Sequence, residues 1–150
     1  MPLRGPGWCL ISLVLLSACN SEQPEPAHVE VPTAGVRVSL TRIATHPFLA
    51  RYRLILEVEG RDGCLGKAEL FPDMGYVGRR NLYQQASGAI IVLGQYDARV
   101  IEPNSCTIRL VEFQSLVEQT TFVGAFDVDA QKRWRYLPSA VRAERPFEKR

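Results

Sequence analysis

Few residues of this chain have the types and spacing that acid–base or nucleophilic chemistry requires. His28 and His46 are its two histidines; His28 lies in a proline-rich stretch and His46 directly precedes Pro47. No serine occupies a Gly-x-Ser-x-Gly elbow, so activation of a nucleophile by an imidazole would rest on His46 alone. We interpret His46 as an exposed loop residue.

Asp127 and Asp129 share one face of a predicted strand, with Cβ atoms about 7 Å apart. Paired carboxylates can perform acid–base chemistry, or bind calcium when further oxygen ligands are present. No flanking run of ligands resembles a calcium loop. We interpret the pair as a solvated strand end, and we expect no catalytic residue, no metal site and no cofactor.

The segment from Gly60 to Lys67 invites comparison with a phosphate-binding loop. That motif needs a glycine five positions before Gly66, where Arg61 stands, and a serine or threonine where Ala68 stands. We therefore interpret the segment as part of a hairpin whose turn lies at Gly60 to Gly63.

One segment combines cations with aromatic rings and is the candidate binding patch. Three basic residues alternate with two aromatic ones there, which allows binding of an anionic or sugar-bearing surface by charge, stacking and cation–π contact. The alternative is that the two aromatic rings cap one side of the core while the basic residues face water. The patch consists of Lys132, Arg133, Trp134, Arg135 and Tyr136.

The first 18 residues have the three parts of a secretory signal. Arg4 lies in a short leading region, and the apolar run from Trp8 to Leu16 covers nine residues, where a spanning helix needs about twenty. The run ends in Leu16-Ser17-Ala18-Cys19, which resembles the lipobox of a bacterial lipoprotein. The alternative is an ordinary secretory signal whose cleavage site lies beside a cysteine.

The lipobox resemblance implies that Cys19 becomes the mature N-terminus and carries a diacylglycerol and an amide-linked acyl chain such as palmitate. Two or more acyl chains anchor a protein stably to its membrane. Asn20 stands where an aspartate would favour retention at the inner membrane, so the resemblance implies the outer membrane and a domain facing the periplasm.

The four cysteines are then accounted for. Cys9 leaves with the signal and Cys19 is lipidated, so Cys64 and Cys106 remain as a pair. In an oxidising periplasm the pair predicts a disulfide. It would close a loop of about 43 residues and contribute roughly 4 kcal/mol to stability. Its expected role is structural.

Removal of the first 18 of 150 residues leaves 132, enough for one domain. The net charge falls to about +1, too small a field to recruit nucleic acid. Residues 20–35 carry three prolines and predict a flexible tether, which at about 3.1 Å per residue reaches roughly 50 Å. Alternatively, part of it pairs as an edge strand through Val29 and Val31. The predicted division is 1–18 signal peptide, 19–35 lipidated cysteine and tether, 36–141 domain, and 142–150 a free charged tail.

From Val36 onward, apolar residues recur mainly at every second position, which predicts strands. Seven or eight short strands indicate an all-β fold, a single antiparallel β-sandwich with one internal disulfide. One alternative is a helix from Leu110 to Gln119, and Gly78 to Ser87 is predicted to be a loop. The predicted strands lie near 36–41, 51–58, 65–71, 89–93, 98–102, 106–111, 121–128 and 134–137.

These features favour a non-enzymatic lipoprotein of the outer membrane that binds a protein or envelope partner, as an assembly module of an envelope or secretion complex. The alternative is an inhibitor of a cell-wall hydrolase such as lysozyme, with the loop from Pro72 to Ser87 entering the active-site cleft. An enzyme is the third class considered.

Overall fold

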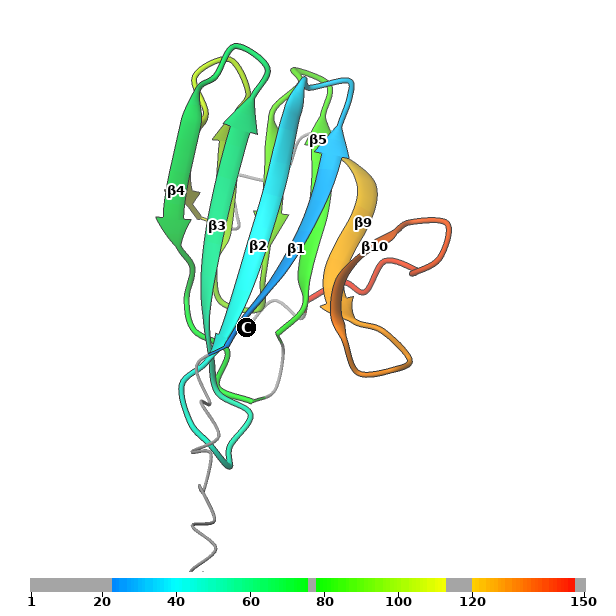
Figure 1. Cartoon of the computed structure of the whole chain (residues 1–150). Coiled ribbons are helices and arrows are strands. Elements are labelled where there is room, and N and C mark those ends of the chain that lie inside the picture. The colour runs from blue at the N-terminus through cyan, green and yellow to red at the C-terminus, as the bar shows by residue number, and fades with distance from the viewer. Residues whose placement is uncertain (1–22, 76–77, 113–119, 148–150) are drawn as a thin grey trace, which may run out of the picture.

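The computed structural model describes residues 23–75, 78–112 and 120–147, and all regular secondary structure in them is β-strand (Figure 1). Two antiparallel sheets confirm the all-β, sandwich-like fold, with ten strands where seven or eight were predicted. The four-stranded sheet has the order β1 (Pro24–Val31), β2 (Val36–Ala44), β3 (Tyr52–Gly60), β4 (Leu65–Glu69). The six-stranded sheet has the order β10 (Trp134–Pro138), β9 (Thr120–Val128), β5 (Arg80–Gln85), β6 (Ile90–Leu93), β7 (Ala98–Glu102), β8 (Thr107–Val111).

The core lies between the two sheets and is built from the alternating rows that the sequence predicted. On β2 and β3 every second residue is buried, which removes one apolar face of each strand from water. The six-stranded sheet contributes a matching set from its inner face. The fully buried members include Val38, Leu40, Leu54, Leu56, Leu82, Ile90, Ile101 and Phe126.

The predicted tether is wrong over residues 24–31, which form the edge strand β1. The strand pairs with β2 from Pro24 opposite Ile43 to Val31 opposite Val36. Ala27 and Val31 are buried against the core. An edge strand needs ladder hydrogen bonds on one side only, so its prolines are tolerated.

The predicted loop at 78–87 is also wrong, because Arg80–Gln85 forms β5 in the middle of the six-stranded sheet. Its first residues, Arg80 and Asn81, are polar, yet both are almost fully buried. Arg80 and Asn81 bond to near neighbours such as Arg79, and also to the distant carbonyls of Phe71 and Arg145, which no local sequence pattern predicts.

A bulge on β9 shifts its side-chain alternation. Leu82 pairs with Gly124 whereas Tyr83 pairs with Phe122, so Val123 is the extra residue. An inserted residue exchanges the two faces of the strand. Regular alternation along the strand predicted at 121–128 would place Phe122 in one inward row with Phe126, and the bulge overturns that expectation. Phe122 packs with Tyr83 in a second apolar cluster, while Val123 packs against the main core.

The C-terminal segment is not the free tail that the sequence predicted, at least through residue 145. Three side chains that alternate along β5 and the residue before it bind this segment, and residues 148–150 lie outside the described part of the chain. The bonds are Arg79 Nη2 to the carbonyl of Ala143 (2.8 Å), Asn81 Nδ2 to the carbonyl of Arg145 (2.9 Å), and the Tyr83 hydroxyl to the Glu144 carboxylate (2.8 Å).

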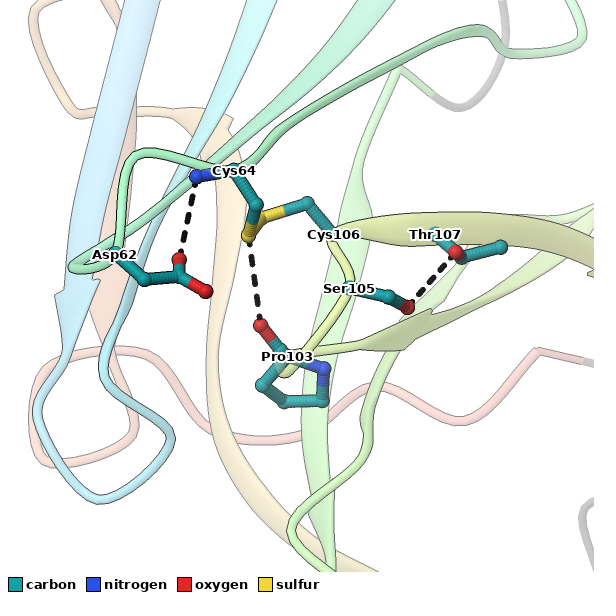
Figure 2. The surroundings of a disulfide bond; sticks show 6 residues. All are labelled: Asp62, Cys64, Pro103, Ser105, Cys106 and Thr107. Carbon is teal, nitrogen blue, oxygen red and sulfur yellow. Dashed lines mark hydrogen bonds between the residues drawn. A yellow bond between two sulfur atoms is a disulfide. The ribbon is translucent and has the colours of Figure 1, made fainter.

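The predicted disulfide joins the two sheets at one end of the sandwich (Figure 2). Cys64 precedes β4 and Cys106 precedes β8, with an S–S distance of 2.04 Å and a Cα–Cα distance of 5.7 Å. The predicted hairpin at 60–63 is confirmed, because β3 and β4 pair on either side of it. A Cβ on Gly66 would collide with the carbonyl oxygen of Cys106, so only glycine lets these segments approach so closely.

Other expectations fall partly or wholly outside the described residues. Leu110 and Val111 belong to β8, and 113–119, the rest of the alternative helix, are not described. The signal and Cys19 are not described either. In the part of the chain that is described, no helix has the length and apolar character needed to cross a bilayer.

Candidate functional site

The sandwich has two ends with different chemistry. The disulfide pole carries the turns at 32–35, 61–64, 86–89 and 103–106, and the N-terminal pole is the end at which β1 begins. Figure 1 shows the start of β1, the loop between β2 and β3 and the turn between β9 and β10 toward the same end. The N-terminal pole comprises the loops 45–51, 70–75, 94–97 and 129–133.

The aromatic rings of the predicted binding patch face inward rather than outward. Trp134 is 5% exposed, and its Nε1 donates to the carbonyl of Leu40 (2.9 Å). The Tyr136 hydroxyl donates to the carbonyl of Val123 (3.0 Å), and its ring packs edge-on against Phe126. Trp134 is thus closed to a stacking ligand and Tyr136 is held within the sandwich, as the alternative interpretation predicted.

The two arginines of the same segment contact Asp129, Arg133 from the turn before β10 and Arg135 from the strand itself. The Asp129 carboxylate accepts the backbone N–H groups of Gln131 and Arg133 (both 2.9 Å) and pairs with the guanidinium groups of Arg133 (2.9 Å) and Arg135 (3.3 Å). The bond from the Arg133 backbone is the largest cause that lowers the pKa of Asp129. Lys132 is exposed in this turn.

Asp127 and Asp129 are ion-paired rather than solvated, which corrects the interpretation of a strand end in water. Asp127 Oδ2 accepts a bond from Arg142 Nε (3.0 Å), and its side chain is 13% exposed. Each carboxylate thus forms an ion pair with an arginine of its own chain, so both aspartates stabilise the fold.

Buried charges at the N-terminal pole are a feature that the sequence analysis missed. Arg42 is 7% exposed; its guanidinium lies 4.3 Å from the centre of the Tyr52 ring and 5.1 Å from that of Trp134. Its Nε donates to Glu25 (3.1 Å). The sequence did contain a signal for the burial of Arg42, because this residue continues the inward-facing row of β2.

Arg80 and Asp97 organise the loop that follows β4. Arg80 donates to the carbonyls of Phe71 (2.9 Å) and Arg79 (3.1 Å), while Asp97 Oδ2 accepts the N–H of Phe71 (3.0 Å). Arg80 Nε lies 3.6 Å from Asp97 Oδ1. Burial lowers the pKa of Arg80, and the charges of Asp97 and Asp73 oppose that effect. These bonds hold the start of the loop, at Phe71, against the six-stranded sheet.

His28 lies exposed on β1, whereas His46 is half-buried at the start of the loop 45–51. His46 Nδ1 accepts the N–H groups of Phe48 (3.1 Å) and Leu49 (3.0 Å). These two bonds shape the loop. The interpretation of His46 as an exposed loop residue is thus only partly right, because the side chain is half-buried and bonded. Phe48 itself is 90% exposed.

Comparison with protein families, curated proteins and solved structures gives no match. The candidate site therefore rests on geometry: the N-terminal pole, where a buried polar layer fixes loops whose apolar side chains face water. A second feature is an open hollow of about 340 Å³ on the outer face of β2, β3 and β4, whose lining includes Glu57, Leu65 and Lys67.

Proposed function

We propose that this protein is a lipoprotein of the outer membrane that faces the periplasm and serves as a non-enzymatic binding or assembly module of an envelope or secretion complex. The lipobox ending at Cys19 supports the anchor. The observation that carries the proposal is the start of β1 at Pro24, only five residues after the proposed lipid.

The short connection sets where such a module would act. Five residues span at most about 18 Å when fully extended, compared with the roughly 50 Å expected of a sixteen-residue tether. A protein anchored in this way would hold its sandwich close to the bilayer. Its partners would therefore be membrane proteins or components lying at the membrane surface.

The use of the polar side chains supports binding over catalysis. Arg42, Arg80, Asp97 and Asp129 all bond to groups of their own chain, so these charged side chains serve the fold itself. A partner has an open edge available: β4 pairs only with β3 in the described part of the chain, and Leu65 on it is 78% exposed. Addition of a strand to such an edge is a common mode of recognition.

The first experiment tests the lipid anchor and the binding of partners as two separate readouts. Full-length tagged protein is labelled with a palmitate analogue in cells and then captured after crosslinking, with the Cys19→Ser variant in parallel. We expect the label on the wild type alone, and a defined set of envelope partners that the variant loses. Absence of label on the wild type would contradict the anchor, and partners retained equally by the variant would contradict a role that depends on it.

The alternative, inhibition of a cell-wall hydrolase, has a narrower basis than the sequence suggested. Part of the segment from Pro72 to Ser87, Arg80–Gln85, forms β5. Asp97 and Arg80 bond to the backbone of Phe71, the residue just before the segment begins. In a turbidity assay with a muramidase, we expect the purified protein to leave lysis unchanged. Stoichiometric inhibition would favour the alternative.

A further inference from the structure

Exposed apolar side chains gather on the loops of the N-terminal pole. Among the described residues, five of the eight large hydrophobic side chains that are exposed lie there. Exposed hydrophobic residues that occur singly are common, whereas a group at one end of a molecule marks a contact surface. The five are Phe48 (90% exposed), Leu49 (49%), Phe71 (43%), Met74 (54%) and Tyr96 (57%).

The most exposed residues are presented by a well-bonded loop. The N–H groups of Phe48 and Leu49 both donate to His46 Nδ1, and the N–H of Thr45 donates to the carbonyl of Arg51 (2.9 Å), which closes the loop at its base. The Phe48 ring also meets the His46 ring edge-on at 6.2 Å. These bonds hold Phe48 outward as a defined feature of the surface.

A second loop adds Met74 to the same surface. A Cβ on Gly75 would lie 3.0 Å from the carbonyl oxygen of Ala50, so the two loops touch. We name Phe48, Leu49 and Met74 together the apolar tip. Arg51 and Arg53, both exposed, follow Phe48 and Leu49 along the chain.

The apolar tip lies at the end of the sandwich where the proposed lipid anchor enters. Pro24 pairs with Ile43, one residue before β2 ends and the loop bearing Phe48 begins. The chain from Cys19 to Pro24 reaches at most about 18 Å. The disulfide pole lies a further eight residues along β1, about 27 Å at the rise of a strand. The anchor therefore keeps the tip, and not the disulfide pole, beside the membrane.

We propose that the apolar tip inserts into the interfacial layer of the membrane that holds the lipid on Cys19, with Arg51 and Arg53 against anionic headgroups. This inference rests on the proposed lipid anchor. Phenylalanine and leucine beside arginine are typical of segments that lie in a membrane interface, and arginines near the surface are attracted to anionic lipid. The tip and the lipid together fix the sandwich upright, so that the β4 edge and the disulfide pole face the periplasm.

Depth-dependent fluorescence quenching tests the insertion. The full-length protein is reconstituted into vesicles of phosphatidylethanolamine and phosphatidylglycerol, with and without a lipid spin-labelled near the headgroup. Phe48→Trp is compared with Leu65→Trp, a matched control because Leu65 is 78% exposed at the opposite pole. The wild type, which carries Trp8 and the buried Trp134, supplies the background that is subtracted from both variants. We expect quenching and a blue shift at position 48 and neither at position 65.

A second arm makes the result independent of lipidation. The Cys19→Ser protein and its Phe48→Ser, Leu49→Ser derivative are titrated with the same vesicles, and we expect at least about tenfold weaker binding for the derivative. Intact mass reports whether Cys19 carries lipid, so failure of the anchor is seen separately. Equal quenching at positions 48 and 65, quenching at neither, or equal binding of the two proteins would overturn the insertion. A protein partner that needs Phe48 while vesicles leave it unquenched would do so as well.

Discussion

Tyr83 shows at the scale of one residue how the fold uses a titratable group. It is 8% exposed on the outer face of β5, and its hydroxyl donates to Glu144 and accepts a bond from Asn81. Burial, together with the bond to Glu144, raises the pKa of Tyr83 to about 12 from its ordinary 10.0. The neutral phenol is therefore part of the attachment of the C-terminal segment.

The raised pKa of Tyr83 predicts a loss of stability at high pH. Between pH 10 and about 12 the unfolded chain has lost the proton that the folded chain retains, so the free energy of unfolding falls as pH rises through this window. Chemical denaturation at several pH values measures the fall, and difference spectroscopy against Tyr83→Phe isolates the titration. In Glu144→Gln the pKa should move back toward 10. An unchanged titration would show that Glu144 has no part in it.

At the scale of the elements, the disulfide connects two hairpins that the sheets leave separate. The β3–β4 turn belongs to one sheet and the β7–β8 turn to the other. Cys106 is 1% exposed, and the Sγ of Cys64 lies 3.7 Å from the carbonyl oxygen of Pro103. Figure 2 also shows Asp62 Oδ1 accepting the N–H of Cys64 (3.2 Å), which shapes the turn for the bridge.

Removal of the bridge should therefore be costly. For Cys64→Ser combined with Cys106→Ser we expect a loss of about 2–5 kcal/mol, because the unfolded chain regains the freedom of a long loop. Thermal and denaturant unfolding of the oxidised wild type and the variant give the difference. Reduced wild type is the control and should behave as the variant does. Equal stability of all three samples would contradict a structural role for the disulfide.

At the scale of the whole molecule, the two sheets are fastened at both ends. The disulfide joins them at one pole; at the other, Asp97 and Arg80 of the six-stranded sheet bond to the backbone of Phe71, which follows the four-stranded sheet. The side chains of Arg80 and Asp97 are 3% and 1% exposed. Because water does not reach this site, it cannot compensate for a charge that a substitution removes from Arg80 or Asp97.

Asp97→Asn tests the second fastening. Loss of the carboxylate beside a buried guanidinium should destabilise the protein by about 3 kcal/mol. The matched control is Glu57→Gln, which breaks the exposed pair between Glu57 and Lys67 and should cost less than about 1 kcal/mol. Urea unfolding of both variants measures the difference. Similar small losses in the free energy of unfolding of the two variants would show that the buried pair does not hold the sheets together.

The local pattern of the sequence was sufficient wherever one face of a strand meets the core and the other meets water. The rows of β2 and β3, the turn at 60–63 and the pairing of Cys64 with Cys106 were all predicted, because alternation, turn residues and cysteine number are local properties of the chain. The candidate patch at 132–136 was visible as a segment, but the direction of its rings was not.

Tertiary structure alone decided which segments join a sheet and which polar residues are buried. β1 was hidden by prolines that an edge position tolerates. β5 was hidden by polar residues, among them Arg80 and Tyr83, whose partners Asp97 and Glu144 lie far along the chain. The bulge at Val123 exchanged the faces of β9. The N-terminal pole emerges only when loops distant in sequence meet, so its apolar tip has no signature in any single segment. Of its buried charges, Arg42 could have been found locally, from its place in the inward row of β2. By itself the sequence determined the β-rich class and the disulfide. The tertiary structure decided which surfaces are left exposed, because burial depends on contacts between residues far apart in the chain.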